Sequence, residues 1–577
     1  MPKTNREISS IFEQMSVLCE LNGDNIFKIR AYQKAANVIA NLEKNVLEMK
    51  EEELLSIRGI GKGIASHIKE IKSNGTFEEF EELKSKYPPG ILEIVNLRGL
   101  GARRVKVLYE KFHIDSVNKL LEFAKKGKIK EIDGFGEKIE KSIIESIEKK
   151  IDMPKRFLFH TAKRMALEII DYMKNLGYEN IEYAGSLRRC KETVGDIDIL
   201  CVGNQKAIKD FIKSPFVKMV LSEGELKASV ILNGEIQCDF RVFKKDEHGA
   251  ALCYFTGSKQ HNIRLREIAN KNNFILNEYG LFKNYGSKEK IAGWDEKEIY
   301  EKLGLQYIPP ELREDSGEIE LAIKYKIPKL VDISDIKGDI HCHTSYTDGA
   351  NSVEEVIDFL AKRYEWSFVG DHSVPLNFVK GLDFKKYISS RKEVSDISRK
   401  YSNKQFDRSI ETEILKDGNL AFKDEELKEI SLVIGAVHTS LRLNKDEQTR
   451  RVIRALTNPY CDVVAHLTQR IIMEREEMDM DYEAVFDAAY KSNAVFEING
   501  QPDRLDLKDV NIKKAKSLGL KLVLSSDAHS LEQFDYISYA LNNARRAGLC
   551  KDDLLNCLSY KDFKNFIKEN RKKRGGL

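Results

Sequence analysis

The sequence predicts a multidomain protein with an all-α N-terminal region, an α+β middle region and a distorted, TIM-like α/β barrel at the C-terminal end. The chain has 577 residues, too many for one hydrophobic core, and roughly 150 residues per domain suggests about four units. Apolar residues first recur at helical spacing. β-rich segments follow, and short apolar strands then alternate with helical segments to the end.

The composition excludes several classes of protein. Hydrophobic residues make up 42% of the chain, and no apolar run reaches the ~20 residues needed to span a bilayer. The first residues show no export signal, so we expect a cytoplasmic chain without a membrane partner. The nine cysteines form no CxxC pair, which argues against a disulfide framework or a thiolate zinc site.

The patterns place the boundaries as follows. We expect helical regions at 1–80 and 81–150, a sheet at 151–243, a smaller α+β region at 244–315, a polar linker at 316–336 and the barrel at 337–577. In the first helix the apolar positions are Ile8, Ile11, Phe12, Met15 and Leu18.

Three glycine turns link helices in the first 150 residues. The stretches 57–63, 97–103 and 132–138 each have the pattern apolar-x-Gly-apolar-Gly. The pattern resembles the helix-hairpin-helix DNA-binding element, in which backbone amides at a helix N-terminus bind a phosphate. Gly-x-Gly is also an ordinary turn, but three copies favour DNA binding. The glycines are Gly59, Gly61, Gly99, Gly101, Gly134 and Gly136.

Two groups of basic residues stand out although the net charge is only +3. The first comprises Arg103, Arg104, Lys106, Lys111, Lys119 and the stretch 125–130. The second, at 571–574, is expected to be a solvated terminus, with DNA contact as the alternative. Taken alone, the first group favours a solvated helical face, with a nucleic-acid surface as the alternative.

Three aspartates form the strongest catalytic pattern. Asp196 and Asp198 are separated by one residue on a predicted strand, so their side chains share a face. Asp239, on a later strand, can complete the set. Three carboxylates that hold two Mg²⁺ or Mn²⁺ ions suit in-line phosphoryl transfer. The alternative is an exposed strand with alternating acids.

This arrangement resembles the nucleotidyltransferase palm of family X DNA polymerases, the group that includes DNA polymerase beta. The motifs are Gly-Ser-x-Arg-Arg at 185–189, Gly-Asp-x-Asp at 195–198 and Tyr-Phe-Thr-Gly-Ser at 254–258. The likeness spans most of residues 1 to about 315. It implies an N-terminal DNA-binding region, a palm at 151–243 and a nucleotide-selecting thumb at 244–315. It also implies a monomer that acts on gapped or primer-template DNA with dNTPs.

The resemblance further implies the nucleotide contacts. They are Ser186, Arg189 and Gly195 for the triphosphate, Tyr254, Phe255 and Gly257 for the sugar, and Asn262 and Arg266 for the nascent base pair. An arginine with further hydrogen-bond donors suits an anion. Tyr254 would crowd a 2′-hydroxyl, which implies a preference for deoxynucleotides; a plain core tyrosine is the alternative.

Two positions depart from the beta-type pattern. His67 stands where the Schiff-base lysine of a deoxyribose-phosphate lyase is expected, and a histidine cannot form that imine. Lys28 and Tyr32 still fit a pocket for a DNA 5′-phosphate, so we expect binding there with weak or absent lyase chemistry. Gln237 replaces an arginine near the third carboxylate, which puts the handling of the primer hydroxyl in doubt.

Histidines dominate the C-terminal region. Six of the 11 histidines follow residue 337, near predicted strand ends or in polar motifs, where a parallel barrel carries its functional residues. His341 and His343 are separated by one residue, and Asp348 lies five residues further on. Imidazoles with carboxylates suit Zn²⁺, Mn²⁺ or Fe²⁺. A lone buried histidine is more often structural.

The set resembles the polymerase-and-histidinol-phosphatase (PHP) domain. The resemblance implies two or three metal ions held by His341, His343, Asp348, His372, Glu411, His438, His466, Asp527 and His529. Glu411 is placed better than Glu413 to bridge metals. Leu467 and Gln469 stand where a proline and a glycine are usual, which puts the pocket shape in doubt.

The two resemblances imply gap filling in base-excision repair, joined to a nuclease that processes DNA 3′ ends. The second activity is a 3′–5′ exonuclease, a 3′-phosphatase or an abasic-site endonuclease, and the sequence leaves these three open. Two alternatives remain. One is a DNA-end-binding scaffold with an inactive palm, and the other is a small-phosphate phosphatase with vestigial polymerase activity.

Overall fold

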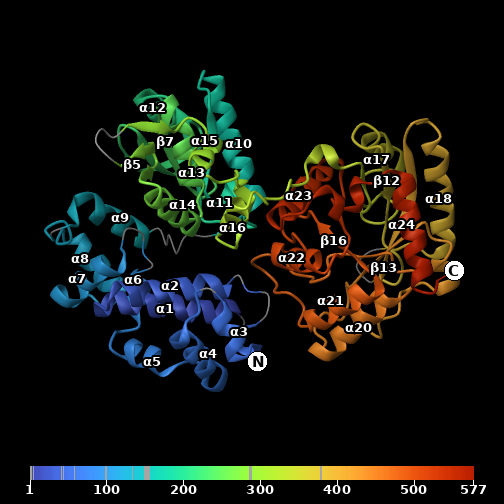
Figure 1. Ribbon diagram of the computed structural model, residues 1–577, viewed down its shortest axis with the longest axis horizontal. Helices are drawn as coiled ribbons and strands as arrows, with labels where there is room; N and C mark the ends of the chain where they lie inside the picture. Colours follow the sequence, from blue (N-terminus) through green and yellow to red (C-terminus); the bar gives the residue numbers. More distant parts are fainter. Residues whose placement is uncertain are drawn as a thin grey trace. The chain divides into compact units, whose positions relative to one another are not determined.

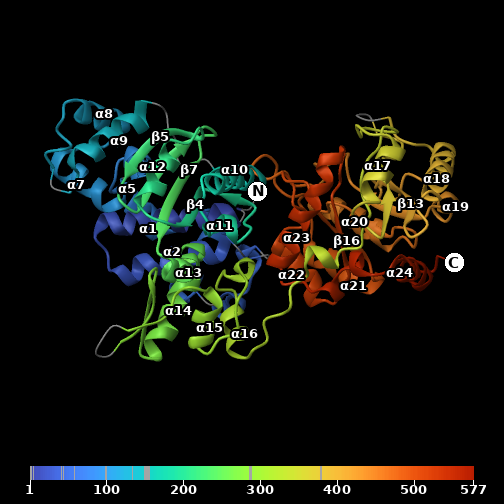
Figure 2. The same cartoon turned by 90° about the horizontal axis from the view of Figure 1, so that it is seen from above.

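The computed structural model divides into two compact units, Met1–Lys155 and Arg156–Leu577 (Figures 1 and 2). The structure describes residues 3, 5–40, 42, 45–57, 59–95, 97, 100–132, 134–148, 156–284, 289–376 and 380–576. Gly99 therefore lies outside the described residues. No helix within these ranges is both long and apolar enough to cross a bilayer.

The first unit is all-helical, as the sequence predicts. Its helices are α1 (Asn5–Asn22), α2 (Ile26–Ala40), α3 (Glu51–Ser56), α4 (Lys62–Asn74), α5 (Glu78–Ser85), α6 (Gly90–Val95), α7 (Ala102–Phe112), α8 (Val117–Lys125) and α9 (Gly136–Glu148). In α1, Ile8, Phe12, Met15 and Leu18 are fully buried. The helical spacing of apolar residues therefore identified the buried face correctly.

The second unit begins with the palm, a five-stranded sheet in the order β2-β4-β7-β6-β5. Its strands are β2 (Ile181–Tyr183), β4 (Asp196–Val202), β5 (Val217–Glu223), β6 (Lys227–Leu232) and β7 (Gln237–Phe243). The helices α10 (Phe159–Asn175), α11 (Gly185–Arg188) and α12 (Gln205–Ile212) accompany it, and β1 (Phe157–Leu158) pairs with β3 (Thr193–Val194). The pairing of β4 with β7 is parallel and aligns their first residues.

The thumb follows as helices beside a small antiparallel sheet. Its elements are α13 (His248–Thr256), α14 (Lys259–Lys271), β8 (Phe274–Asn277), β9 (Gly280–Lys283), β10 (Lys290–Ala292) and α15 (Glu296–Lys302). The segment expected as a linker carries α16 (Glu318–Ile323), whose Ile319 and Ala322 are fully buried in the thumb core. The thumb core therefore extends beyond the expected boundary at 315, because α16 presents an apolar face to it.

The rest of this unit is a nearly closed parallel barrel in the order β11 to β17. The strands are β11 (Gly338–Asp339), β12 (Trp366–Val369), β13 (Gln405–Glu413), β14 (Leu432–Ala436), β15 (Val463–Val464), β16 (Val495–Asn499) and β17 (Leu522–Ser525). The helices between them are α17 (Val353–Leu360), α18 (Phe384–Ser398), α19 (Asp424–Leu427), α20 (Lys445–Thr457), α21 (Tyr482–Ser492) and α22 (Asp509–Ser517). After β17 come α23 (Ile537–Arg546) and α24 (Tyr560–Lys573). A parallel bridge between Cys342 and Ala528 joins the segments that follow the first and last strands.

The basic C-terminal stretch is only partly solvated: Lys572 and Lys573 are exposed, as expected, but Arg571 and Arg574 contact the barrel. Arg571 lies at the end of α24, is 7% exposed, and its Nε donates to Oδ1 of Asp462 at 2.8 Å. Nη1 of Arg574 donates to the carbonyl of Cys461 at 2.7 Å. These two arginines dock the last helix on the barrel, because buried guanidinium groups need carboxylate or carbonyl partners.

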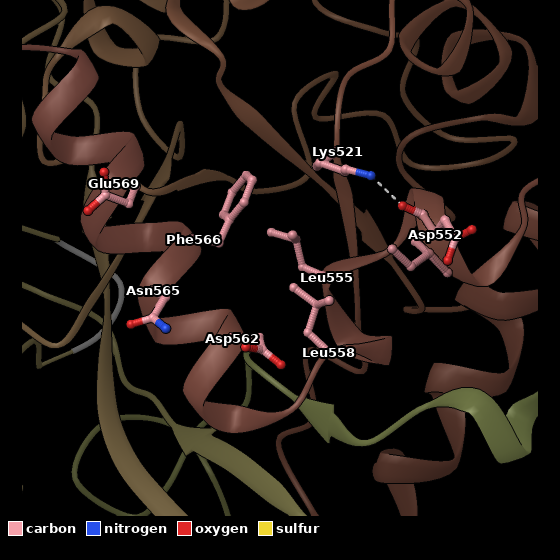
Figure 3. A pocket seen from close by; sticks show the side chains of 9 residues that line it. Lys521, Asp552, Leu555, Leu558, Asp562, Asn565, Phe566 and Glu569 are labelled. Atoms are coloured by element: carbon pink, nitrogen blue, oxygen red, sulfur yellow. Dashed lines mark hydrogen bonds between the residues drawn. The ribbon is translucent and has the colours of Figure 1, made fainter.

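A cavity of about 350 Å³ lies between α24 and the start of β17 (Figure 3). Lys521, directly before β17, lines it and donates to the carbonyl of Asp552. Leu555 and Phe566 give it an apolar wall. Because Asp527 and His529 follow the other end of β17, this cavity belongs to the opposite end of the barrel from the histidine cluster.

Candidate functional site

The three aspartates of the palm meet on two adjacent strands. Asp198 on β4 stands opposite Asp239 on β7 in the parallel register, and Asp196 precedes Asp198 by two residues on the same face. Oδ2 of Asp198 packs so close to Gly185 that a Cβ there would lie 2.6 Å from it. Gly185 also has a φ of +65°, so the turn before the carboxylates requires glycine.

Hydrogen bonds fix the third carboxylate. Oδ1 of Asp239 accepts from Oγ of Ser229 at 2.7 Å and from Nε2 of Gln237 at 3.0 Å. Oδ2 accepts from Nη2 of Arg241 at 2.7 Å and lies 3.1 Å from Nζ of Lys227. Gln237 thus orients Asp239, and Arg241 supplies a positive charge beside it. Burial opposes ionisation, but these donors hold the pKa of Asp239 below its usual value.

The other two carboxylates are in the opposite electrostatic situation. Burial, and then the charge of Asp196, raise the pKa of Asp198 to about 7. Burial and the charge of Asp239 also raise the pKa of Asp196. Three carboxylates crowded in this way repel one another, and a divalent cation would relieve the repulsion. Their oxygen donors fit a hard cation.

The nucleotide-binding residues of the expected set lie around this sheet. Ser186 and Arg189 belong to the turn of α11 and the residue after it, and Nε of Arg189 donates to Oε1 of Glu314 at 3.1 Å. A second guanidinium nitrogen, Nη1, donates to the carbonyl of Thr256. A Cβ at Gly257 would lie 3.2 Å from Nη1, so Gly257 gives Arg189 its room.

The sugar and base-pair contacts form a second group. The rings of Tyr254 and Phe255 meet edge to face at 5.0 Å, and Nδ2 of Asn262 donates to the carbonyl of Tyr254 at 2.6 Å. Tyr254, Asn262 and Arg266 line one small cavity. Tyr254 is half-buried, as a tyrosine in a binding wall would be. Around Gly195 an added Cβ would meet no atom within 4 Å.

The glycine turns of the first unit divide into two kinds. Gly59, Gly134 and Gly136 have φ values of +113°, +84° and +64°, a region that favours glycine. Gly61 and Gly101 have extended backbones and precede the first residues of α4 and α7. An added Cβ at either would meet no atom within 4 Å, so these two amides are open to a ligand.

The expected 5′-phosphate pocket contains an acid that the sequence analysis did not include. Glu79 lies 2.7 Å from Nζ of Lys28 and accepts a hydrogen bond from Oη of Tyr32 at 2.7 Å. His67 lies beside them, with its Nε2 3.2 Å from Glu79. Lys28, Tyr32 and His67 are therefore together, but all three contact a carboxylate, which a phosphate would have to displace.

The barrel brings the histidines together at the C-terminal ends of its strands. Three groups have ligand atoms within 4.8 Å of one another: His343 with Asp348, His372 and His529; His341 with His343 and Asp527; and His372 with Glu411 and His438. The groups share His343 and His372, as neighbouring cation sites do. The ninth expected ligand, His466, lies outside these groups, but its Nε2 is 2.9 Å from Oε1 of Glu411.

Glu411 and Glu413 have different surroundings although they lie on the same strand. Glu411 is at the centre, 2.7 Å from Nδ1 of His372 and 3.2 Å from Nε2 of His438. Glu413 instead contacts Nδ1 of His438 at 2.8 Å and accepts from Oγ1 of Thr439 at 2.7 Å. Glu411 therefore faces the cluster, and Glu413 orients His438 through the ring nitrogen that points away from Glu411.

Sequence reasoning missed one residue of this cluster, Glu497, and the contact that another, Gln469, makes. Oε1 of Glu497 lies 2.6 Å from Nδ1 of His341, and its Oε2 accepts from the backbone N–H of His466 at 2.8 Å. A lone acid within the apolar stretch 495–498 was the available signal. Gln469 contacts Nδ1 of His466 and has a φ of +54°, which explains why glycine suits this position.

The donor atoms fit divalent cations. Nε2 of His341, Nδ1 of His343 and Oε2 of Glu411 are buried without a hydrogen bond in the described part of the chain. Buried polar atoms normally have a partner. Burial, and then His372 and His529, lower the pKa of His343 to about 4, which keeps this imidazole in the neutral form that binds metal. His, Asp and Glu groups able to hold divalent metal are thus present.

Known proteins are similar to this chain in both its N-terminal and its C-terminal part. Family profiles match at residues 251–314 (DNA polymerase beta thumb), 3–77 (helix-hairpin-helix domain) and 91–149 (SAM-like helix-hairpin-helix tandem). DNA polymerase lambda of Arabidopsis thaliana is 24% identical over 54% of this chain and 62% of its own. A probable phosphatase of Thermoanaerobacter sp. (strain X514) is 30% identical over 29% of this chain and 70% of its own.

One relative extends along the whole sequence. The DNA polymerase/3′-5′ exonuclease PolX of Bacillus subtilis (strain 168) is 33% identical over 571 residues, which cover 98% of this chain and 99% of that protein. The chain therefore belongs to the PolX family, the family X DNA polymerases that carry a C-terminal PHP domain.

Proposed function

We propose that this protein is a DNA-directed DNA polymerase that fills short gaps in base-excision repair, and that its PHP domain is a 3′–5′ exonuclease for the same DNA ends. It would act as a monomer on gapped or primer-template DNA in the cytoplasm, at the nucleoid. The observation that carries the proposal is the parallel register that places Asp198 opposite Asp239, with Asp196 on the same face.

The palm residues would divide the work of synthesis. Asp196, Asp198 and Asp239 would hold Mg²⁺ or Mn²⁺, which supplies charge stabilisation for phosphoryl transfer when bound. Asp239 is held as an anion by its donors, so it is ready to bind a cation. Asp198, whose pKa is near 7, would lose its proton as the cation arrives.

The nucleotide would be gripped by the donors next to these carboxylates. Ser186, Arg189 and Gly195 would bind the triphosphate. Arg189 would either leave Glu314 and Thr256 or contact them and the triphosphate at the same time. Tyr254, Phe255 and Gly257 would flank the sugar. Asn262 and Arg266, which line a cavity with Tyr254, would face the nascent base pair.

DNA would be held through its backbone by the first unit. The open amides at Gly61 and Gly101 would each bind a phosphate, Gly59 would shape the turn of the first hairpin, and Gly134 and Gly136 would shape the third. Lys28 and Tyr32 would contact a 5′-phosphate after release from Glu79. Lyase chemistry would be weak or absent, because His67 cannot form an imine.

The PHP domain would hydrolyse a phosphodiester at the primer end. His341, His343, Asp348, His372, Glu411, His438, His466, Asp527 and His529 would hold two or three Mn²⁺, Zn²⁺ or Fe²⁺ ions. When bound, such ions supply Lewis acidity toward the phosphodiester. Glu413 and Glu497 would orient His438 and His341 through their Nδ1 atoms.

The test is primer extension on DNA with a one-nucleotide gap, with Mg²⁺ or Mn²⁺ and each dNTP in turn. We expect incorporation of the one nucleotide complementary to the template base. Absence of extension by a folded, metal-loaded preparation would sink the polymerase proposal.

A second candidate function rests on the likeness to a probable phosphatase. In that case the PHP domain would release phosphate from small phosphate monoesters. Comparison of phosphate release from histidinol phosphate with shortening of a labelled DNA primer separates the two. We expect the primer to be the better substrate, and the reverse ranking would favour the phosphatase.

A further inference from the structure

One arginine of the PHP domain reaches into the palm. Arg546 ends α23, is 5% exposed, and its Nη1 donates to the carbonyl of Arg189 at 2.6 Å and to Oε1 of Glu314 at 3.1 Å. Its Nε and Nη2 donate to Oδ2 of Asp509 at 3.1 and 2.7 Å. The guanidinium group thus has one side on a barrel carboxylate and the other on the palm, a planar fork that a lysine cannot reproduce.

The same palm atoms also hold the expected triphosphate contact. Oε1 of Glu314 accepts from Nε of Arg189 at 3.1 Å as well as from Arg546. Burial opposes ionisation, but Arg546, Lys191 and Arg189 lower the pKa of Glu314 to about 2. Glu314 is therefore an anion shared by two arginines, one from the palm and one from the barrel. Removal of either cation leaves a buried charge with fewer partners.

A second barrel arginine holds the other end of the same palm loop. Nη1 of Arg470 lies 2.9 Å from Oε2 of Glu192, while its Nε donates to the carbonyl of Arg504 at 2.8 Å. The loop from 189 to 192 joins the turn that carries Ser186 to β3, which directly precedes the strand that carries Asp196. The barrel therefore holds both ends of the segment between the triphosphate contacts and the catalytic carboxylates.

The contact continues around these two arginines. Nε of Arg545 donates to Oε1 of Glu311 in the thumb at 2.7 Å. The ring of Tyr539 on α23 meets Phe159 of α10 edge to face at 5.8 Å. Charged pairs beside aromatic packing are the composition of a specific domain interface.

From these contacts we infer that Arg546 is a positioning residue for nucleotide binding: the PHP domain, through Arg546 and Glu314, fixes the backbone and side chain of Arg189 in the polymerase site. The inference rests on the proposed triphosphate role of Arg189. Loss of Arg546 should leave Asp196, Asp198, Asp239 and the PHP ligands in place, because Arg546 touches none of them. It should disturb the nucleotide contact, which depends on where Arg189 points.

The test is the steady-state kinetics of single-nucleotide gap filling by the full chain. For Arg546→Ala we expect the KM for the complementary dNTP to rise about tenfold, which corresponds to about 1.4 kcal/mol of lost binding. The kcat should change less than threefold, and the affinity for gapped DNA and the metal content of the PHP domain should stay at the wild-type values. Arg546→Lys should have an intermediate KM, because an ammonium keeps the charge but not the fork.

Arg363→Ala is the matched control, since Arg363 is an exposed arginine of the same domain that pairs with Asp535 at the surface. It should leave the KM unchanged. Asp509→Asn keeps Arg546 but removes its barrel anchor, so it should raise the KM even if Arg546→Ala does not fold. Glu314→Gln should itself raise the KM for the dNTP. Because Arg546 acts through Glu314, adding Arg546→Ala to Glu314→Gln should raise the KM little further.

Two results would overturn the inference. One is a wild-type KM in folded Arg546→Ala and in Asp509→Asn. The other is a fall in kcat, DNA affinity and metal content together, which marks a general structural role. If the proposed function itself were wrong, the wild-type chain would show no gap filling. That result differs from both results that would overturn the inference about Arg546.

Discussion

Oε1 of Glu497 lies 2.6 Å from Nδ1 of His341, and both side chains are fully buried. This contact turns Nε2 of His341 toward Glu411 and Asp527, 3.5 and 3.6 Å away. A carboxylate behind a histidine fixes the ring and its tautomer when the other nitrogen binds metal. Glu497 thus supports the PHP cluster although it is outside the expected ligand set.

Substitution of Glu497 by Gln should weaken metal binding without abolishing it. We expect about a 10- to 100-fold loss of metal affinity, the usual effect of losing such a partner. Primer shortening should fall in step and recover with excess Mn²⁺, while gap filling stays unchanged. Metal content after dialysis and Mn²⁺ titration of the nuclease measure this. Glu483→Gln, on the surface of α21, is the control, and equal metal affinity in both variants would contradict the assignment.

The hairpin glycines with open amides give a test of DNA binding. An alanine at Gly61 or Gly101 has space in the free protein and an ordinary backbone, so stability should not change. Its methyl group would block a phosphate that approaches the amide. We expect about tenfold weaker binding of gapped DNA, the value of one hydrogen bond to a charged group.

Fluorescence anisotropy at two salt concentrations is the measurement for these glycines, with Gly224→Ala in the palm as control. The wild-type affinity should fall steeply with salt. Unchanged affinity in the doubly substituted Gly61→Ala, Gly101→Ala chain would show that these hairpins only link helices.

A buried charge group that joins the thumb to Arg188 of the palm makes a contribution to stability that depends on pH. Oε1 of Glu296 is 2.6 Å from Nη1 of Arg313, and Oε2 is 2.7 Å from Nη2 of Arg188. Although burial opposes ionisation, Arg313 and Arg188 lower the pKa of Glu296 from 4.5 to about 2. A carboxyl group with a lowered pKa stabilises the fold fully above its unfolded pKa, near 4.5, and loses this contribution as the pH falls toward 2.

Glu296→Gln should therefore cost about 3 kcal/mol of unfolding free energy at pH 7, since it leaves two buried guanidinium groups without their anion. The difference from wild type should stay constant down to about pH 4.5 and shrink below it. Urea denaturation followed by the fluorescence of Trp294 measures it. Glu301→Gln, exposed on the same helix, should change little at any pH. A difference that persisted unchanged at pH 3 would exclude the ion-pair explanation.

The sequence predicted the architecture well because its strongest signals are local. The buried face of α1 follows from helical spacing, and the strand register of Asp196 and Asp198 follows from alternation. The barrel follows from the repeated order of strand and helix, which the parallel pairing of β11 to β17 confirms. The segment 316–336 was misjudged, because polar residues concealed the apolar face of α16.

What the sequence could not supply are contacts between residues far apart in the chain. Glu497 is 156 positions from His341, and Arg546 is 357 from Arg189. Nothing local in an apolar strand or at a helix end indicates such a partner. Arg571 is similar: a run of basic residues at a chain end suggests solvent, and only the buried Asp462 shows that it docks.

The central claim is that one chain carries two separate catalytic centres, and paired substitutions test it most directly. Gap filling and primer shortening are measured side by side for Asp196→Ala with Asp198→Ala, and for His341→Ala with His343→Ala. The first variant should lose synthesis by about 10³-fold, because cations supply several kcal/mol of charge stabilisation there, and keep shortening. The second should show the reverse. Loss of both activities in either folded variant would contradict the two-centre account.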